Sequence, residues 1–405
     1  MVKKMRFEWN PCSLVNKNNH VIAKFAVTFF LMGLAFRLLY SHSIGYLPIS
    51  VEQVEKPSVE SLVLPAPTLV SSEILQAGDQ NAQKGAPELY EEWASSGYLY
   101  WRWKPRDYEL SQFDAERFLV VMRNKSWAFI GDSISRNHVQ SLLCILSKVE
   151  EAVEVYHDKE YRSKIWHFPS HNFTLSVVWS PFLAHAETFE DSDGVSSAEI
   201  QLYLDEVDKK WTDQYQNYDY MVIAGGKWFL KTAIYYENKT IKGCHYCPGK
   251  NLTEVGVDYA YRKVLQMVFN FITSSDHDAT VMFRAATPDH FENGEWFSGG
   301  TCKRMVPFKQ GEMDLIDIDS MMRTIELEEF EKAAEVGSQR GLTIKLLDTS
   351  QLSLLRPDGH PGPYRHFHPF AKDINATVQN DCLHWCLPGP IDSWNDMVMQ
   401  MVLNL

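Results

Sequence analysis

The sequence predicts an α/β fold in which a parallel β-sheet is covered by helices on both faces. Short runs rich in Val, Ile and aromatic residues alternate with longer amphipathic segments after residue 126, and this alternation is typical of βαβ units. A chain of 405 residues can bury a large core, and 13% of its residues are aromatic. We therefore expect a packed globular domain rather than a disordered chain.

Five short apolar runs are predicted to be strands, because buried parallel strands are short and rich in β-branched and aromatic residues. They are Trp127–Ile130, Thr174–Trp179, Tyr220–Ala224, Thr280–Arg284 and Thr343–Leu347. Four segments are predicted to be helices, the first of them because its apolar residues form one stripe at helical spacing. The helices are Ser135–Ser147, Ala198–Lys209, Asp258–Ile272 and Glu326–Gln339.

The N-terminal part of the chain is predicted to be a membrane anchor followed by a stem. Residues 21–40 are long enough to span a bilayer if Lys24 and Arg37 extend to the interface. Basic residues before this segment predict a cytosolic tail over residues 1–20. A cleaved signal peptide is the alternative, but no small-x-small cleavage site follows. Proline-containing residues 41–88 then form a luminal stem, and residues 89–405 form the folded domain.

Glycosylation sequons, cysteines and charge agree with a luminal domain. Asn172, Asn238, Asn251 and Asn375 are candidate glycosylation sites, whereas Asn124 lies so close to a predicted strand that we expect it to stay unmodified. The cysteines fit an oxidising compartment. The formal net charge of −13 argues against nucleic acid as a partner, because phosphate binding needs a basic face.

Ser133 is the predicted nucleophile. It lies in the segment Gly131-Asp132-Ser133, which joins the first predicted strand to the first predicted helix. A sharp turn at that place presents the hydroxyl clear of the sheet and directs backbone N–H groups at a developing oxyanion. Gly131 permits the tight turn. A Gly-Asp-Ser tripeptide alone is usually only a turn, so its place between a strand and a helix is what favours a function.

Asp381 and His384 are the predicted acid and base. They are three residues apart, so the carboxylate can orient the imidazole and stabilise the imidazolium that forms during acyl transfer. The alternative is a structural histidine beside an aspartate that caps a turn. Together with Ser133 the pair predicts an acyl-serine intermediate, and these residues leave open whether water or a hydroxyl accepts the acyl group.

Four sequence blocks resemble the plant trichome birefringence-like proteins, a family of Golgi polysaccharide O-acetyltransferases. The blocks are Trp101–Pro105, Gly131–His138, Arg356–Gly362 and Asp381–Pro390, and the resemblance runs from about Tyr98 to Leu405. It implies a three-layer sandwich similar to the GDSL/SGNH hydrolases, with a smaller lobe beside it. Residues 89–405 would be the O-acetyltransferase domain of a single-pass type II Golgi membrane protein.

The resemblance also implies the chemistry. Ser133 would take an acetyl group from a donor, and His384, oriented by Asp381, would activate a sugar hydroxyl to receive it. The Gly243–Pro248 stretch looks most like the branch that acetylates xyloglucan and mannans. We expect no bound cofactor, with acetyl-CoA or an acetylated carrier as the donor and xyloglucan or glucomannan as the acceptor. A carbohydrate acetyl esterase of the same fold and a non-catalytic polysaccharide-binding protein are the alternatives.

Further residues are candidates for contacting the substrate or the oxyanion, because they lie in the family blocks or at predicted strand ends. They are Gly131, Asp132, Arg136, Asn137, Gly226 and Arg284. For Arg284 an ion pair at the strand end is an equal alternative, and Asn137 is as well suited to brace the turn. Aromatic residues near the site could form walls on which sugars stack, although buried aromatics usually belong to the core.

The chain departs from the family in the segment before the Trp-Arg-Trp block. Family members normally carry cysteines there, whereas this chain has none between Cys12 and Cys144, which predicts a shortened smaller lobe and weakened activity. We expect Cys302–Cys382 to remain as the long-range disulfide, and the pairing of the other cysteines stays open. No metal is expected, since the His-rich stretch 360–384 contains no His-x-x-x-His helix. His360 is predicted instead to order a loop near the triad.

Overall fold

The computed structural model of the chain describes residues 110–187 and 198–404, together with Leu99 and Trp103. The predicted cytosolic tail, membrane span and stem over residues 1–88 lie outside the described residues, as does most of the Trp101–Pro105 block. Within the described part of the chain, no helix combines the length and hydrophobicity that crossing a bilayer requires.

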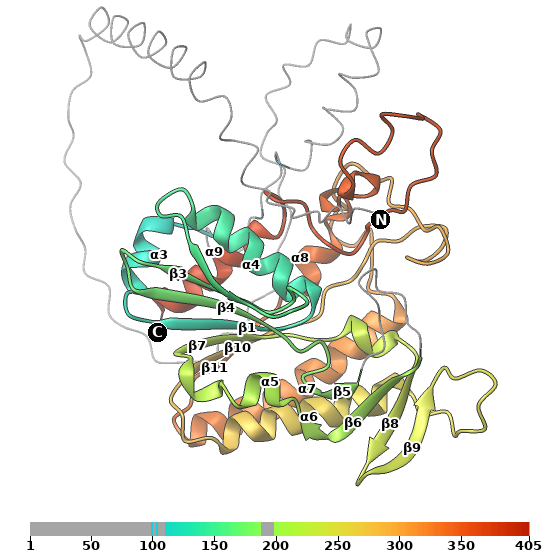
Figure 1. The fold of residues 1–405 in the computed structure, drawn as a ribbon, viewed down its shortest axis with the longest axis horizontal. Helices are drawn as coiled ribbons and strands as arrows, with labels where there is room; N and C mark the ends of the chain where they lie inside the picture. The colour runs from blue at the N-terminus through green and yellow to red at the C-terminus, as the bar shows by residue number, and fades with distance from the viewer. Residues whose placement is uncertain (1–98, 100–102, 104–109, 188–197, 405) are drawn as a thin grey trace, which may run out of the picture. The chain divides into compact units, whose positions relative to one another are not determined.

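A seven-stranded sheet forms the centre of the molecule, in the strand order β11-β10-β7-β1-β4-β3-β2 (Figure 1). The five predicted strands are the five parallel strands: β1 Ser126–Gly131, β4 Phe173–Trp179, β7 Tyr220–Ile223, β10 Thr280–Arg284 and β11 Ile344–Leu347. At one edge β2 (Val153–His157) and β3 (Lys164–Phe168) pair antiparallel. The predicted parallel sheet is therefore extended by a hairpin into a mixed sheet.

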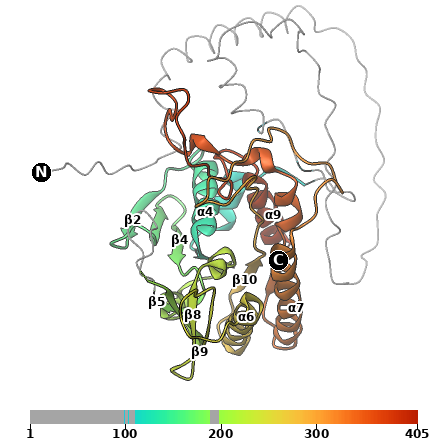
Figure 2. The same ribbon diagram turned by 90° about the vertical axis from the view of Figure 1, so that its right-hand side faces the viewer.

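Helices cover both faces of this sheet (Figure 1). One face carries α3 (Ala115–Val121), α4 (Ser133–Leu146) and α9 (Asp392–Leu403), and the other carries α6 (Val257–Ser274) and α7 (Asp317–Gln339). The last two pack side by side (Figure 2). Three of the four predicted helices are confirmed as α4, α6 and α7, with different boundaries, whereas α9 was not predicted. The result is a three-layer α/β sandwich.

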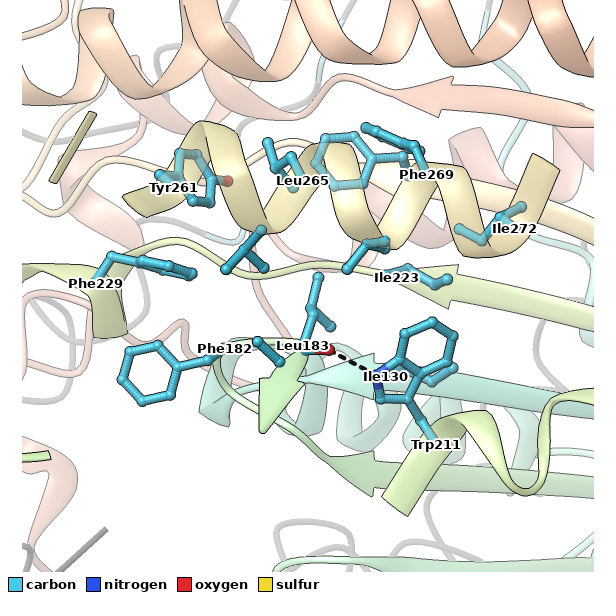
Figure 3. Close-up of a cluster of buried hydrophobic side chains, with 14 of the residues drawn as sticks. Ile130, Phe182, Leu183, Trp211, Ile223, Phe229, Tyr261, Leu265, Phe269 and Ile272 are labelled. Atoms are coloured by element: carbon cyan, nitrogen blue, oxygen red, sulfur yellow. Dashed lines mark hydrogen bonds between the residues drawn. The ribbon is translucent and has the colours of Figure 1, made fainter. Parts of the chain in front are cut away.

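Residues of β1 alternate between the two cores because successive side chains of a strand point to opposite faces. Trp127 and Phe129 pack under α3, α4 and α9, whereas Ala128 and Ile130 pack toward α6 and α7. Figure 3 shows the core between the sheet and α6, in which Tyr261, Leu265, Phe269 and Ile272 project from one face of α6 toward the sheet. Every residue of β1 after Ser126 is buried, so this strand is a rigid base for the turn that follows it.

A second, four-stranded sheet has the order β5-β6-β8-β9. Its strands are β5 Ala184–Glu187, β6 Ile200–Val207, β8 Ala233–Glu237 and β9 Thr240–His245. The predicted helix Ala198–Lys209 is wrong, because β6 occupies this segment. Ile200, Leu202 and Leu204 are buried at every second position, which is the period of a strand rather than of a helix.

The remaining elements are short. They are α5 (Lys209–Thr212), α8 (Ser350–Leu354) and the 3₁₀ turns η3 (Tyr215–Asn217), η4 (Lys227–Leu230), η5 (Pro357–Gly359) and η6 (Pro363–Arg365). Because β1, β4, β7 and β10 run parallel, their carboxyl ends meet at one edge of the sheet. The turn at Ser133 leaves the central strand at this edge, where open α/β sheets bind their ligands.

Candidate active site

The turn between β1 and α4 presents Ser133 as the first residue of the helix. Gly131 has φ = 153°, and a Cβ at this position would lie 2.2 Å from the carbonyl oxygen of Ala224, so only glycine fits. The Asp132 carboxylate accepts a hydrogen bond from the Ile134 backbone N–H at 2.9 Å and caps the helix. Asp132 therefore shapes the turn, and Ser133 remains half-buried at the amino end of a 14-residue helix.

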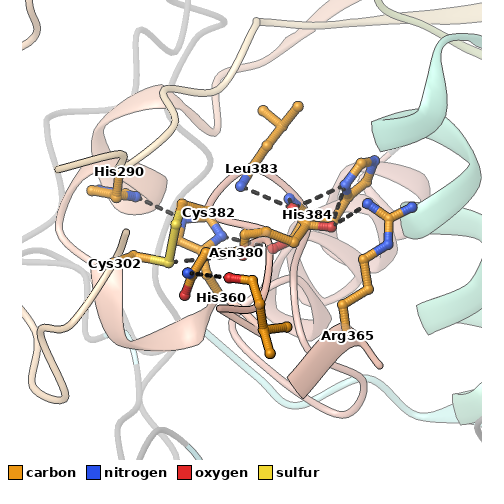
Figure 4. Close-up of a disulfide and its surroundings, with 10 residues drawn as sticks. His290, Cys302, His360, Arg365, Asn380, Cys382, Leu383 and His384 are labelled. Carbon is orange, nitrogen blue, oxygen red and sulfur yellow. Dashed lines mark hydrogen bonds and ion pairs between the residues drawn. A yellow bond between two sulfur atoms is a disulfide. The ribbon is translucent and has the colours of Figure 1, made fainter. Parts of the chain in front are cut away.

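Asp381 and His384 are in contact, as the predicted acid–base pair requires, and Figure 4 shows His384 beside Arg365. His384 Nδ1 lies 2.9 Å from Asp381 Oδ2, and Oδ1 accepts the backbone N–H groups of Leu383 and His384 at 3.1 and 2.9 Å. Arg365 adds a contact of 2.7 Å to Oδ2. An ionised acceptor fixes the proton of His384 on Nδ1, which leaves Nε2 able to take a proton.

The environment of Asp381 keeps its carboxyl group ionised. The residue is 1% exposed, and burial by itself would raise its pKa. The charge and hydrogen bond of His384, together with the charge of Arg365, outweigh burial and hold the pKa of Asp381 below its ordinary value. The carboxylate is thus available to stabilise an imidazolium at neutral pH.

Asn137 joins the serine helix to the histidine loop. Its side-chain amide donates to the Trp385 carbonyl at 3.2 Å, and its Oδ1 accepts the Trp385 N–H at 2.8 Å. Asn137 lies one helical turn after Ser133, and Trp385 directly follows His384. Although the described residues include no hydrogen bond between Ser133 and His384, this buried two-bond contact brings their segments together. Catalytic hydrogen bonds are often longer before substrate binds.

Replacing Asn137 with Ala is expected to lower kcat by roughly 10- to 100-fold, because a small displacement of a reacting group has an effect of this size. The substitution also leaves the buried N–H and C=O groups of Trp385 without partners, which we expect to lower the free energy of unfolding by about 2–4 kcal/mol. Steady-state kinetics on the folded fraction and urea unfolding measure the two effects. A less stable variant with unchanged kcat would show that Asn137 does not position the base.

The Arg356–Gly362 block supports the other side of this loop. Gly362 and Asp381 exchange backbone hydrogen bonds of 3.0 and 2.9 Å, and the Gly359 carbonyl accepts the N–H of Cys386 at 2.9 Å. A Cβ on Gly359 would lie 2.2 Å from Pro390 Cγ, so the backbone of Gly359 packs directly on the ring of Pro390. Arg356 and Asp358 form a buried ion pair in the same block.

Disulfides also lie beside this loop and in the second sheet. The structure joins Cys302 to Cys382, the residue after Asp381, and this is the pairing that the resemblance implies. It also joins Cys244 to Cys247 at the end of β9. Among the described residues, no group of three or more His, Cys, Asp or Glu side chains is arranged to hold a metal ion.

His360 contacts the back of the loop that carries Asp381 and His384, so the ordering role stays a prediction that this contact supports. Its Nδ1 lies 2.7 Å from the His384 carbonyl oxygen, and its ring stacks on Trp385 with centroids 4.3 Å apart. Its Nε2 lies 2.7 Å from Nδ1 of His290, which in turn reaches the Leu354 carbonyl at 2.9 Å. Burial lowers the pKa of His360 to about 3 and also lowers the pKa of His290.

Lowering the pH from 7 to 4 is expected to destabilise the protein through His360. The pKa of this group is about 3 in the folded protein and 6.5 for an ordinary histidine, so the unfolded chain takes up a proton that the folded protein does not. The stability contributed by neutral His360 is complete above pH 6.5 and decreases below it, by roughly 3 kcal/mol at pH 4. Glu326, whose raised pKa has the opposite effect over this pH range, contributes to every variant, so the loss is measured as the difference in urea unfolding between the parent protein and a variant that lacks His360.

A His360→Asn variant is the control for this experiment. Its side-chain amide can still donate to the His384 carbonyl but does not titrate, so it should lose less stability between pH 7 and 4. His138, whose pKa burial also holds well below 6.5, contributes equally to both proteins. Asp381 contributes only below an ordinary carboxyl pKa of 3.8. Equal losses in the variant and the parent protein would contradict the assignment to His360.

Arg284 lies behind the serine turn rather than on an open surface. It is 2% exposed, its guanidinium carbon lies 5.1 Å from the centroid of the Trp394 ring, and its Nε and Nη1 atoms find no partner among the described residues. No salt bridge to Arg284 occurs in the described part of the chain, so the ion-pair alternative gains no support. The predicted contact of Arg284 with the substrate or the oxyanion stays a prediction. Burial lowers the pKa of Arg284, although the charges of Asp132 and Glu326 partly oppose this effect.

Glu326 of α7 is a neighbour of Arg284 that the sequence did not single out. Its carboxyl group accepts the Ala286 N–H at 3.0 Å and the hydroxyl of Tyr261. Burial raises the pKa of Glu326 to about 7. A charged residue inside an amphipathic helix gives no sequence signal of burial, so only the fold identifies this contact.

The remaining predicted residues are distributed around the site. Gly226 follows β7, and the pairing of Ile130 with Ile223 places it at the same sheet edge as Ser133. Trp385 and Phe229 belong to the core, whereas Trp296 is 40% exposed. The Trp296 ring centroid lies 5.5 Å from the guanidinium carbon of Arg365. The candidate glycosylation residues are all exposed: Asn172, Asn238, Asn251 and Asn375.

Comparison with known proteins agrees with this geometry. The PC-Esterase family, described as a GDSL/SGNH-like acyl-esterase family found in Pmr5 and Cas1p, matches residues 110–401. Protein trichome birefringence-like 26 of Arabidopsis thaliana is 51% identical over 408 residues, which cover 97% of this chain and 89% of the relative. Protein trichome birefringence-like 25 of the same plant is 49% identical over 448 residues, covering 99% and 97%.

A further relative carries an activity in its name. Xyloglucan O-acetyltransferase 2 of Populus trichocarpa is 43% identical over 334 residues, which cover 81% of this chain and 76% of the relative. The alignment therefore covers about three quarters or more of each chain.

Proposed function

The chain belongs to the PC-Esterase family, among the trichome birefringence-like proteins, and we propose that it transfers acetyl groups to hydroxyls of a cell-wall hemicellulose. The observation that carries the proposal is the Asn137 contact, which joins the helix of Ser133 to the loop of His384 and Asp381. The similarity to a xyloglucan O-acetyltransferase supports xyloglucan, or the related glucomannan, as the acceptor.

The first half of the reaction acetylates Ser133. His384 Nε2 takes the proton of the Ser133 hydroxyl as the oxygen attacks the carbonyl carbon of the donor. Backbone N–H groups at the start of α4 stabilise the negative charge on the carbonyl oxygen, since the first N–H groups of a helix have no partner within it. The tetrahedral intermediate then expels the leaving group of the donor, which receives the proton from His384.

The second half transfers the acetyl group to the sugar. His384 removes a proton from the attacking hydroxyl, the new ester bond forms, and the bond to Ser133 Oγ breaks as the serine recovers its proton from His384. Asp381 remains ionised throughout and stabilises the imidazolium. Trp296, half-exposed beside Arg365, offers an aromatic face on which a sugar ring can stack close to the site.

Water is the competing acceptor, and with water the same residues would make a carbohydrate acetyl esterase. The chemistry of the triad is identical in both reactions, so only the placement of a sugar hydroxyl in preference to water distinguishes them. The description of the family as acyl-esterases makes this the second candidate function.

A set of three parallel incubations separates these functions. The full-length protein is mixed with acetyl-CoA and xyloglucan or glucomannan oligosaccharides, and in parallel with the same oligosaccharides already acetylated. Mass gains of about 42 Da per acetyl group on the sugar support the transferase, and brief incubation without acceptor should give the same gain on Ser133. Loss of acetyl from the modified sugars supports the esterase. Saturable binding without either change would leave only a polysaccharide-binding protein.

We also propose that the domain works in the Golgi lumen, anchored by the predicted span at residues 21–40. The four exposed sequon asparagines and the two disulfides support a luminal environment. In sealed Golgi vesicles, added protease should leave the domain intact until detergent is present, and a glycosidase should reduce its apparent mass. Digestion in intact vesicles would contradict this orientation.

A further inference from the structure

Two arginines, Arg136 and Arg162, lie against the ring of Trp179 beside the serine turn. We refer to these three residues as the Arg–Trp–Arg cluster. Trp179 is the last residue of β4 and pairs in register with Gly131 of β1. The guanidinium carbons of Arg136 and Arg162 lie 5.6 and 5.1 Å from the centroid of its ring. Both distances are within the range of cation–π attraction. The cluster therefore borders the same sheet edge as the nucleophile.

The cluster is held in place by a short turn before β3. The Asp158 carboxylate accepts the backbone N–H groups of Arg162 and Ser163 at 2.7 and 2.8 Å. Ser163 Oγ in turn accepts the backbone N–H of Trp179 at 3.0 Å, and Trp179 is 8% exposed. The position of Arg162 is thus fixed relative to β4, although it lies in a loop.

The guanidinium groups of Arg136 and Arg162 retain N–H donors that no described residue accepts. Neither group donates a hydrogen bond or forms a salt bridge to any residue in the described ranges 110–187 and 198–404. The carboxylate of Asp158 is engaged by backbone groups, and that of Asp132 caps α4. Two planar forks of N–H donors therefore remain available to a ligand next to Ser133.

The positive charges of Arg136, Arg162 and Arg365 lie near one another. Among the described residues, no carboxylate forms a salt bridge with Arg136 or Arg162. Burial lowers the pKa of Arg136, and the nearby positive charges of Arg162 and Arg365 lower it further, while Asp132 and Asp158 offset only part of this effect. Arg365 already pairs with Asp381. In a chain with a net charge of −13, a local excess of unpaired arginines is costly unless a bound anion compensates it.

We propose that Arg136 and Arg162, braced on Trp179, bind a phosphate group of the acetyl donor. The inference rests on the proposed function and names the chemistry of its donor. Guanidinium groups match phosphate oxygens through paired hydrogen bonds. The donor is the better occupant than the acceptor because xyloglucan and glucomannan carry no charge that could satisfy these groups. Phosphate binding here places the leaving group of the donor beside the amino end of α4.

Calorimetric titration of the full-length protein with inorganic pyrophosphate tests this assignment. We expect saturable binding that weakens at least tenfold in the Arg136→Gln/Arg162→Gln double variant and about as much in Arg162→Gln alone, whose loop position makes misfolding a smaller concern. Arg117→Gln, an exposed arginine on α3, is the matched control and should bind as the parent protein does. Ser133→Ala should bind pyrophosphate as the parent protein does. Pyrophosphate binding therefore tests this site, whereas acetylation of Ser133 tests the proposed chemistry, and either can fail without the other.

Three outcomes would overturn the proposal. The first is the absence of saturable pyrophosphate binding to the parent protein. The second is equal binding by the parent protein and the Arg162→Gln variant. The third is binding of a glucuronic acid oligosaccharide that depends on both arginines while pyrophosphate fails to compete, which would assign the cluster to an acidic acceptor instead of the donor.

Discussion

Replacing Ser133 with Ala is expected to reduce acetyl transfer by about 10⁴- to 10⁶-fold, the range found when the nucleophile of a serine triad is removed. Without Oγ no acetyl-enzyme forms, and only binding and the backbone donors at the start of α4 remain to accelerate a direct transfer. The measurement combines steady-state transfer to oligosaccharides with intact-protein mass after incubation with donor alone. The parent protein should gain one acetyl group and the variant none.

Ser135→Ala provides the matched control for this experiment. The change is chemically identical and lies two residues along the same helix, and Ser135 Oγ is a buried atom without a hydrogen-bond partner among the described residues. Transfer by this variant should stay within a few-fold of the parent rate. If Ser133→Ala retained a tenth of the parent rate, the acetyl-serine route would be ruled out.

Replacing Asp381 with Asn is expected to lower kcat at neutral pH by about 10³- to 10⁴-fold. The amide can preserve the contacts that Oδ1 accepts from Leu383 and His384, so the loop should keep its shape. At the Oδ2 position, however, an NH₂ group would face His384 Nδ1 and the Arg365 guanidinium. A donor there forces the imidazole proton onto Nε2, which can then no longer accept the proton of Ser133.

Asp392→Asn is the corresponding control. Asp392 lies at the start of α9 and accepts hydrogen bonds from Ser141 and Gly389, so it probes the same kind of change outside the acid–base pair. We expect its effect on kcat to be less than tenfold. Activity measured against pH, together with urea unfolding of each variant, separates loss of the base from loss of the fold. A stable Asp381→Asn variant with near-parent kcat would identify another orienting group.

Much of the central sheet follows from local sequence pattern. The five parallel strands are short runs of Val, Ile and aromatic residues, and their burial on both faces leaves little room for another interpretation. The segment from Ile200 to Val207, which lies in a predicted helix, is a strand whose buried residues repeat with period two. A strand with one exposed face gives a weaker sequence signal than the buried central strands.

The predicted acid–base pair and the residues that contact it differ in how far the sequence reveals them. Asp381 and His384 are three residues apart, so their contact is local. The partners of Asn137 are 248 residues away in the chain, and Arg162 reaches the cluster from a loop before β3. Such contacts depend on how the helices, strands and loops pack together. The spacing of two residues along the chain does not reveal them.

The placement of the acid–base loop has a consequence for biosynthesis. Every described strand precedes Asp381 in the chain, and α9, which follows His384, packs against α4 through the contacts of Ser141 with Asp392 and Asn395. Because polypeptides are made from the N-terminus, Ser133 is synthesised long before its base. A nascent chain therefore carries Ser133 before the loop of His384 has emerged and before α9 can dock on α4. A chain that ended before this helix would lack one of the three helices that cover this face of the sheet.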